Sequence, residues 1–129
     1  MLRKQDSSYS RGVWAEDEAA RYLCGQGFSM LKKRYKTKFG EIDLITQKDN
    51  LICFVEVKIR QSEAEALESI TLRSRKRIEN SALFFLSENP EFMSYDMRFD
   101  VIAVFKSGNS CDIDDFEITH LDNAWEAGA

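Results

Sequence analysis

Two neighbouring segments with the character of β-strands, joined by a short polar stretch, constrain the fold of this chain most. Residues 40–46 alternate acidic and apolar side chains, and residues 51–59 are rich in β-branched and aromatic side chains. The intervening residues 47–50 are typical of a turn, so the sequence predicts a β-hairpin here. With the two central residues of that stretch as the turn, Lys48 pairs with Leu51.

The alternation of side chains along a strand places two carboxylates on one face of this hairpin. A two-residue turn sets Asp43 directly across from Glu56, with Cβ atoms about 4.5–5.5 Å apart. A four-residue loop leaves the two carboxylates diagonal, but still on one face. Lys58 shares the face of Glu56, and the same rule predicts that Ile42 and Leu44 lie together on the opposite face.

Carboxylates on one face repel each other unless a cation lies among them. Mg²⁺ or Mn²⁺ suits such a site, because Mg²⁺ typically takes one or two protein carboxylates and fills its other positions with water and phosphate oxygens. Asp43 and Glu56 would hold the metal, and Lys58 would orient water or stabilise charge on phosphorus. The alternative is a surface ion pair between Glu41 and Lys58. Residues 51–59 are too apolar for a solvated edge strand, which favours a charged face lining a cleft.

The other elements follow from hydrophobic periodicity and from helix start and stop signals. Together they predict an α/β fold in which helices flank a mixed central sheet. We expect one domain over residues 1–129, with a flexible arm at 1–9 and a flexible tail at 122–129. The elements are a helix from Ser10 to Gly25, a strand opening at 28–31 and entering the basic stretch 32–38, the hairpin, a mobile loop at 61–69, a helix over about 71–87, a strand at 97–105 and a further strand at 116–121.

Composition limits the function classes. Apolar runs fall far short of the roughly 20 residues of a membrane span, and no apolar segment follows the first cations, so we expect a cytoplasmic protein without a membrane partner. Three widely spaced cysteines and one histidine indicate neither a zinc site nor a disulfide framework. The net charge of −4 divides unevenly, with +4 in residues 1–60, −2 in 61–107 and −6 in 108–129. A basic N-terminal half can therefore attract a polyanion despite the acidic total.

Two clusters of cations flank the proposed site in sequence. Five cations in seven residues precede the hairpin, and a second group opens the helix at 71–87, where cations oppose the helix dipole unless an anion binds. Solvated basic surfaces and phosphate-binding surfaces are both compatible with these patterns. The candidate nucleic-acid-binding residues are Lys32, Lys33, Arg34, Lys36, Lys38, Arg60, Arg73, Arg75 and Lys76.

The same residues resemble a known family. The run Gly40-Glu41-Ile42-Asp43-Leu44-Ile45, followed by Phe54-Val55-Glu56-Val57-Lys58 and Arg60, closely resembles the YraN-like family of predicted endonucleases. The resemblance covers roughly residues 12–125. That family is similar to the PD-(D/E)xK nucleases, and especially to archaeal Holliday-junction resolvases.

The resemblance implies a restriction-endonuclease-like αβββαβ core with Asp43, Glu56 and Lys58 as the catalytic set. It also implies that Glu16, on the first helix, is a fourth acidic group and a metal ligand. The expected function is a divalent-metal-dependent endonuclease acting on DNA, with branched or structured DNA as one option and a homodimer left open. The chain departs from the family at Arg34, where asparagine is frequent. Two alternatives remain, namely a catalytically silent nucleic-acid-binding module and an interaction protein with a structural ionic network.

Overall fold

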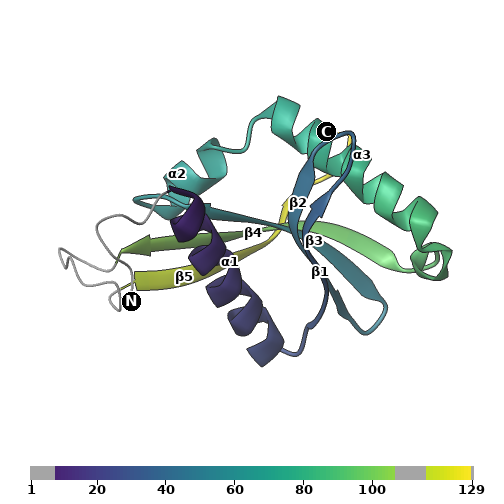
Figure 1. Ribbon diagram of the computed structural model, residues 1–129, viewed down its shortest axis with the longest axis horizontal. Coiled ribbons are helices and arrows are strands. Elements are labelled where there is room, and N and C mark those ends of the chain that lie inside the picture. The colour runs from purple at the N-terminus through teal and green to yellow at the C-terminus, as the bar shows by residue number, and fades with distance from the viewer. Residues whose placement is uncertain (1–7, 107–115, 129) are drawn as a thin grey trace.

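A computed structural model describes residues 8–106 and 116–128 of the chain (Figure 1). Five strands form one sheet in the order β1-β2-β3-β4-β5, in which β3 and β4 are parallel and the other neighbours antiparallel. The elements are α1 (Ser8–Gly25), β1 (Ser29–Lys36), β2 (Glu41–Lys48), β3 (Leu51–Ile59), α2 (Glu63–Glu68), α3 (Leu72–Glu88), the 3-10 helix η1 (Pro90–Phe92), β4 (Asp96–Lys106) and β5 (Phe116–Trp125).

The two long helices cover opposite faces of the sheet (Figure 1). Ala15, Ala19 and Leu23, spaced one helical turn apart, bury the inner side of α1. The inner side of α3 buries Ile78, Ala82 and Phe85 against the other face. This mixed sheet flanked by helices confirms the predicted α/β class and is consistent with a restriction-endonuclease-like core.

The central hairpin forms with the predicted turn. Lys48 pairs with Leu51, and the pairing continues to Leu44 and Val55. Asp49, in the turn, has a positive φ of 53°, which is tolerated by aspartate more readily than by most residues. The short polar connection and the β-branched strand after it were therefore sufficient to predict the register of β2 and β3.

The prediction that Ile42 and Leu44 share a face is wrong. Ile42 packs with Ile45 in the apolar cluster under α3, whereas Leu44 packs in the cluster under α1. Strict alternation therefore breaks between Ile42 and Ile45. The break coincides with the end of the backbone ladder between β2 and β3, whose last pair is Leu44 with Val55.

Three expected boundaries also need correction. Residues 61–69 are not only a loop, because α2 forms there with the Ser62 side chain accepting a hydrogen bond from the N–H of Glu65 at 3.2 Å. The first helix begins at Ser8, before the expected cap at Ser10, and residues 1–7 of the expected arm lie outside the described part of the chain.

The expected tail at 122–129 is wrong for its first half, because β5 continues to Trp125. The Trp125 ring stacks on Phe99 with centroids 5.1 Å apart, and its indole N–H donates to Glu79 of α3 at 3.0 Å. These contacts with β4 and α3 bury Trp125 and hold the strand end. In residues 8–106 and 116–128, no helix is long and apolar enough to cross a membrane.

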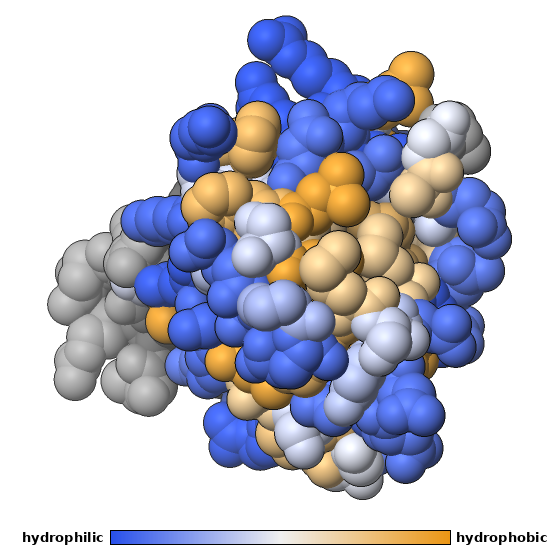
Figure 2. All heavy atoms as spheres, turned by 90° about the vertical axis from the view of Figure 1, so that its right-hand side faces the viewer, coloured by the Kyte–Doolittle hydropathy of each residue, from blue (hydrophilic) through white to orange (hydrophobic). Residues whose placement is uncertain are grey.

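Apolar side chains also reach the surface beside α3. Figure 2 shows the face at the right of Figure 1, where orange residues gather in the middle and hydrophilic residues surround them. Leu83 on α3 is 58% exposed, and Met93, just after η1, is 67% exposed. The outer side of α3 is therefore more apolar than a fully solvated helix requires.

Candidate active site

The hairpin brings Asp43 and Glu56 together where its backbone ladder ends. Beyond the pair formed by Leu44 and Val55, the carboxylate of Asp43 accepts a hydrogen bond from the backbone N–H of Val57 at 2.8 Å. The Asp43 side chain therefore accepts a hydrogen bond from the backbone of β3 at the point where the regular pairing of β3 with β2 stops. This bond fixes Asp43 beside the Glu56-Val57-Lys58 segment, although the alternation of side chains from which we predicted this closeness breaks in β2 at this point.

Glu56 is a buried carboxylate with an unsatisfied oxygen. Its residue is 8% exposed, and its Oε1 atom has no hydrogen-bond partner among residues 8–106 and 116–128. The other oxygen lies 3.8 Å from the Nζ atom of Lys58, at the outer limit of an ion pair. Since buried polar atoms are nearly always paired, an unpaired carboxylate oxygen beside a second carboxylate is suited to accept a further ligand.

The pKa values of both carboxyl groups are raised for the same reasons. Burial is the main cause for Asp43, opposed by the bond from Val57, and the net effect raises its pKa from 3.8 to about 6. Burial raises the pKa of Glu56 from 4.5 to about 8, with the charge of Asp43 adding to the shift and that of Lys58 reducing it. At neutral pH the two groups therefore resist carrying two negative charges together.

The donor set fits a hard divalent cation. Two carboxylates, one with a free oxygen, match the one or two protein carboxylates that Mg²⁺ typically takes. A dication between them would stabilise the charged forms of both carboxyl groups, which burial disfavours. Mg²⁺ or Mn²⁺ held by Asp43 and Glu56 is therefore chemically consistent with the buried pair.

Glu16 does not join this pair. Its carboxylate binds Arg34, with 2.8 Å between Oε1 and the Nε atom. Lys33 and Tyr35 of β1 pair with Leu44 and Ile42 of β2, so Arg34 lies opposite Asp43. Arg34 has a positive φ of 51°. Glu16 is still close enough for its charge to raise the pKa of Asp43. Among residues 8–106 and 116–128, no three acidic, histidine or cysteine side chains are grouped as a metal site, so a metal role for Glu16 stays a prediction.

The predicted nucleic-acid-binding residues fall into two groups. Five of them already contact protein groups. Lys33 binds Asp17 of α1 at 3.0 Å, Arg34 binds Glu16, and Arg60 donates to the backbone of Ile59. Arg75 lies over the ring of Trp125 at 5.8 Å, and Lys38 lies over the ring of Phe39 at 5.4 Å. The others, which are exposed cations on β1 and α3, are Lys32, Lys36, Arg73 and Lys76. The second group is better placed to bind a polyanion, because its side chains are exposed.

Arg77 is a cation that our list of binding residues omitted. The turn between β1 and β2 approaches α3 so closely that a Cβ at Gly40 would lie 3.3 Å from the Cβ of Arg77. The same contact includes a hydrogen bond of 2.8 Å between the hydroxyls of Thr37 and Ser81. Arg77 follows Arg73 by one helical turn, and this spacing, together with a glycine just before the strand that carries Asp43, was the available signal in the sequence.

Asp100 and His120 are structural, as expected. Asp100 is fully buried, and its carboxylate accepts hydrogen bonds from Arg98 at 2.8 and 2.9 Å, from the backbone of Asn123 at 3.0 Å, and from His120, 2.7 Å away. Burial acts to raise the pKa of Asp100, but the bonds from His120, Arg98 and Asn123 outweigh it and lower the pKa to about 2. This network joins β4 to β5 and leaves no free carboxylate oxygen.

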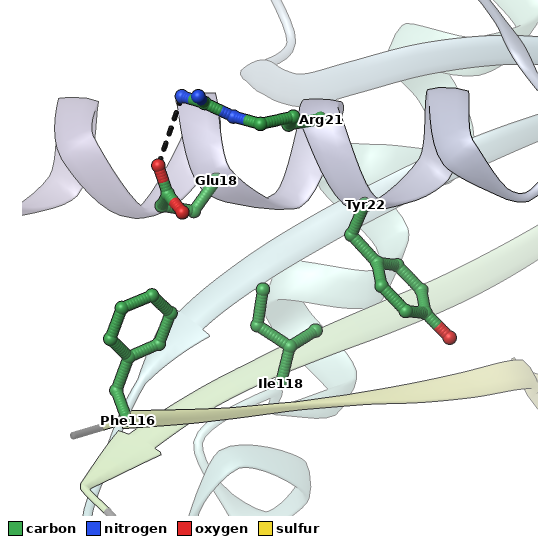
Figure 3. A pocket seen from close by; sticks show the side chains of 5 residues that line it. All are labelled: Glu18, Arg21, Tyr22, Phe116 and Ile118. Atoms are coloured by element: carbon green, nitrogen blue, oxygen red, sulfur yellow. Dashed lines mark hydrogen bonds and ion pairs between the residues drawn. The ribbon is translucent and has the colours of Figure 1, made fainter. Parts of the chain in front are cut away.

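A pocket of about 340 Å³ lies elsewhere, between α1 and β5 (Figure 3). Phe116 and Ile118 point from β5 toward α1, and Tyr22 closes one side. The two charged residues of its lining, Glu18 and Arg21, bind each other at 3.0 Å. An apolar pocket with one internal ion pair offers no groups for phosphodiester chemistry, so the hairpin site remains the candidate active site.

The fold and this site together define an α/β protein with a mixed sheet and a buried carboxylate pair beside a lysine. Residues 15–104 match the model of the uncharacterised protein family UPF0102. The chain belongs to this family, which is the YraN-like group that the sequence motifs indicated.

Relatives in the same family cover most of the chain. It is 41% identical over 124 residues to a UPF0102 protein of Azorhizobium caulinodans, an alignment that covers 96% of this chain and 88% of that one. It is 43% identical over 117 residues to a UPF0102 protein of Sulfurihydrogenibium sp., covering 89% and 93% of the two chains. A third relative, from Mesorhizobium japonicum, is 43% identical over 100 residues, covering 78% and 80%.

Proposed function

We propose that this protein is a divalent-metal-dependent endonuclease that hydrolyses phosphodiester bonds in DNA. The observation that carries the proposal is the buried pair of Asp43 and Glu56, in which one oxygen of Glu56 lacks a partner and Lys58 lies beside the other. A structural ionic network would satisfy that oxygen, because an unpaired buried carboxylate destabilises a fold without compensation. A metal site, in which this oxygen of Glu56 binds a cation, accounts for the unpaired oxygen.

Each residue of the site has a defined role in this proposal. Asp43 and Glu56 would hold Mg²⁺ or Mn²⁺, which supplies charge stabilisation at phosphorus and activates water. The hydrogen bond from Val57 orients the Asp43 carboxylate before any ligand arrives. Lys58, partly exposed at 26% of its side chain, can reach from Glu56 toward a phosphate and stabilise the negative charge that develops there.

DNA is supported as the partner by the placement of charge. Exposed cations extend from β1 across the following turn to the first turns of α3, around the strand that begins with Glu41 and carries Asp43. Phosphate contacts from such a surface supply affinity without selecting a sequence. Substrate choice must therefore come from other groups.

A cleavage assay with matched variants tests the catalytic proposal. The protein is incubated with four-way-junction, flap, single-stranded and linear duplex DNA in Mn²⁺ or Mg²⁺. We expect cleavage of at least one substrate, its loss in EDTA, and a decrease of about 100-fold or more in Asp43→Asn and Lys58→Ala. Glu117→Gln, which makes the same change of charge as Asp43→Asn on an exposed residue of β5, serves as the control. If no substrate is cut, or if the two variants cut as well as the parent, the catalytic proposal fails.

Two further measurements separate the alternatives. A catalytically silent nucleic-acid-binding module would bind these DNAs and cut none of them. A structural ionic network would give no change in melting temperature with Mn²⁺, whereas a metal site should raise it in the parent but not in Asp43→Asn.

A homodimer remains a proposal as well. Leu83 on α3 and Met93 just after η1, two exposed apolar side chains, would suit contact with a second copy of the chain. Sedimentation equilibrium should give a mass of two chains for the parent and of one chain for Leu83→Ser, and a monomeric parent at all concentrations would exclude the dimer.

A further inference from the structure

Phe39 is an aromatic side chain presented at the surface next to the candidate active site. It lies in the turn between β1 and β2 and is 40% exposed. Its only described ring neighbours are Phe84, 6.5 Å away at an angle of 62°, and the Lys38 ammonium, 5.4 Å from the ring centroid. An edge contact at that distance leaves much of the ring uncovered.

The turn holds this ring in place. The Thr37 hydroxyl accepts hydrogen bonds from the backbone N–H groups of Phe39 at 3.0 Å and Gly40 at 3.2 Å, and it pairs with Ser81 of α3 at 2.8 Å. The backbone N–H of Thr37 donates to Gly40 at 2.8 Å. Figure 1 shows this turn lying against α3. A side chain on so constrained a turn loses little conformational freedom when it binds a ligand.

The surroundings are cationic. Lys36 and Lys38 precede Phe39 in the sequence, and Arg77 of α3 lies against Gly40, which follows it. An exposed aromatic among cations is the arrangement that binds single-stranded nucleic acid, in which bases stack on the ring and the cations contact the backbone. In a duplex the bases are already stacked on each other, so the ring has no free base to contact.

The sequence separation limits how far Phe39 can lie from the carboxylate pair. Phe39 precedes Asp43 by four residues, so the two backbone positions are at most about 13 Å apart. At 3.4 Å per nucleotide, this is the length of about four stacked nucleotides. A base on Phe39 would therefore belong to the same strand segment that passes the metal-binding pair.

We propose that Phe39 is a base-stacking residue that makes this site prefer DNA with unpaired nucleotides. The inference rests on the proposed function, since it assumes that DNA reaches this surface. It adds a residue outside the carboxylate and lysine set and assigns the source of substrate choice to the β1–β2 turn.

Binding measured in EDTA tests the inference without cleavage. Fluorescence anisotropy compares the parent with Phe39→Ala, Phe39→Leu and Phe39→Trp on three probes of equal length, namely oligo(dT), an abasic oligonucleotide that carries phosphates and sugars only, and a blunt duplex. We expect Phe39→Ala to weaken oligo(dT) binding by about 5-fold or more and to leave abasic and duplex binding unchanged. Phe39→Trp should retain the affinity of the parent.

Two control variants separate the loss of the aromatic ring from a change in the fold or in the apolar surface. Phe39→Leu keeps an apolar contact for Phe84 but lacks an aromatic face, so it should behave like Phe39→Ala while melting at the temperature of the parent. Leu67→Ala removes another apolar side chain that is 40% exposed, on α2, and should bind all probes as the parent does.

The outcomes distinguish this inference from the catalytic proposal. Equal losses on oligo(dT) and abasic probes, or none on either, would overturn the stacking role of Phe39. A selective loss on oligo(dT) in a protein that cuts no DNA would support Phe39 and refute only catalysis. A parent that binds none of the probes would overturn the stacking role of Phe39, and the cleavage assay in Mn²⁺ would then decide the catalytic proposal by itself.

Discussion

The buried position of Glu56 predicts that removing its charge stabilises the protein when no metal is bound. Its pKa is raised from 4.5 to about 8, so between these values the folded state binds more protons than the unfolded state. The stabilisation from that proton is fully present below about pH 4.5 and is lost as the pH rises through about 8. Above pH 8 the fold carries an ionised, buried and incompletely paired carboxylate.

The size of the effect follows from the shift. A difference of about 3.5 pKa units at 1.36 kcal/mol per unit gives about 5 kcal/mol, which is an upper limit because Asp43 shares the proton. Glu56→Gln should therefore be more stable than the parent at pH 9, by on the order of 2 to 5 kcal/mol. Near pH 4.5 the difference should nearly vanish, because Glu56 is then protonated in the folded protein.

Urea unfolding of both proteins in EDTA and a reducing agent, at pH 4.5 and pH 9, measures this difference. Comparing the variant with the parent at each pH cancels the contributions of titrating groups other than Asp43, which is coupled to Glu56. Glu117→Gln, on the exposed side of β5, should show no gain that depends on pH. Equal stabilities of Glu56→Gln and parent at pH 9, or a gain larger at pH 4.5, would refute the account of Glu56 as a destabilising buried charge.

Three further substitutions test the packing around the site. Asp100→Asn should lower the free energy of unfolding by about 3 kcal/mol at pH 7, measured by urea unfolding, and the difference should shrink as the pH falls toward 2, where the parent carboxylate protonates. Gly40→Ala places a methyl group 3.3 Å from Arg77 and should destabilise by about 1 kcal/mol, with an unchanged melting temperature counting against that close approach. Trp125→Phe keeps the stacking on Phe99 but loses the bond to Glu79, so thermal melting should show a loss of about 1 kcal/mol. A loss of that size is not expected if the end of β5 is loosely held.

Features coded by adjacent residues were predictable from the sequence. The turn at 47–50 and the strand after it defined the register of the hairpin, and this register led to Asp43, Glu56 and Lys58. The short helix α2 was also within reach, because Ser62 and Glu65 have the spacing of a capping box. We expected a loop there because three glutamates outweighed that signal.

Features that depend on distant partners were not predictable. Trp125 is held by Glu79, which is 46 residues away, so a polar segment near the end of the chain gave no sign of burial. The ion pair of Arg34 with Glu16 joins β1 to α1 across 18 residues. The resemblance implied a metal role for Glu16, which stays a prediction, whereas the structure shows that the carboxylate of Glu16 binds Arg34.

Departures from regular structure concentrate around the carboxylate pair. Arg34 has a left-handed backbone opposite Asp43, the β2–β3 ladder stops at Leu44, and Glu56 buries an unpaired oxygen. Each of these features opposes stability, by roughly 1 to 3 kcal/mol for a strained or unsatisfied group, and the same strands are otherwise well packed. Folding alone does not require them, since a regular hairpin with an apolar residue at 56 would pack without these losses. Their coincidence at one point supports, independently of any relative, the proposal that the hairpin binds a cation and its ligand.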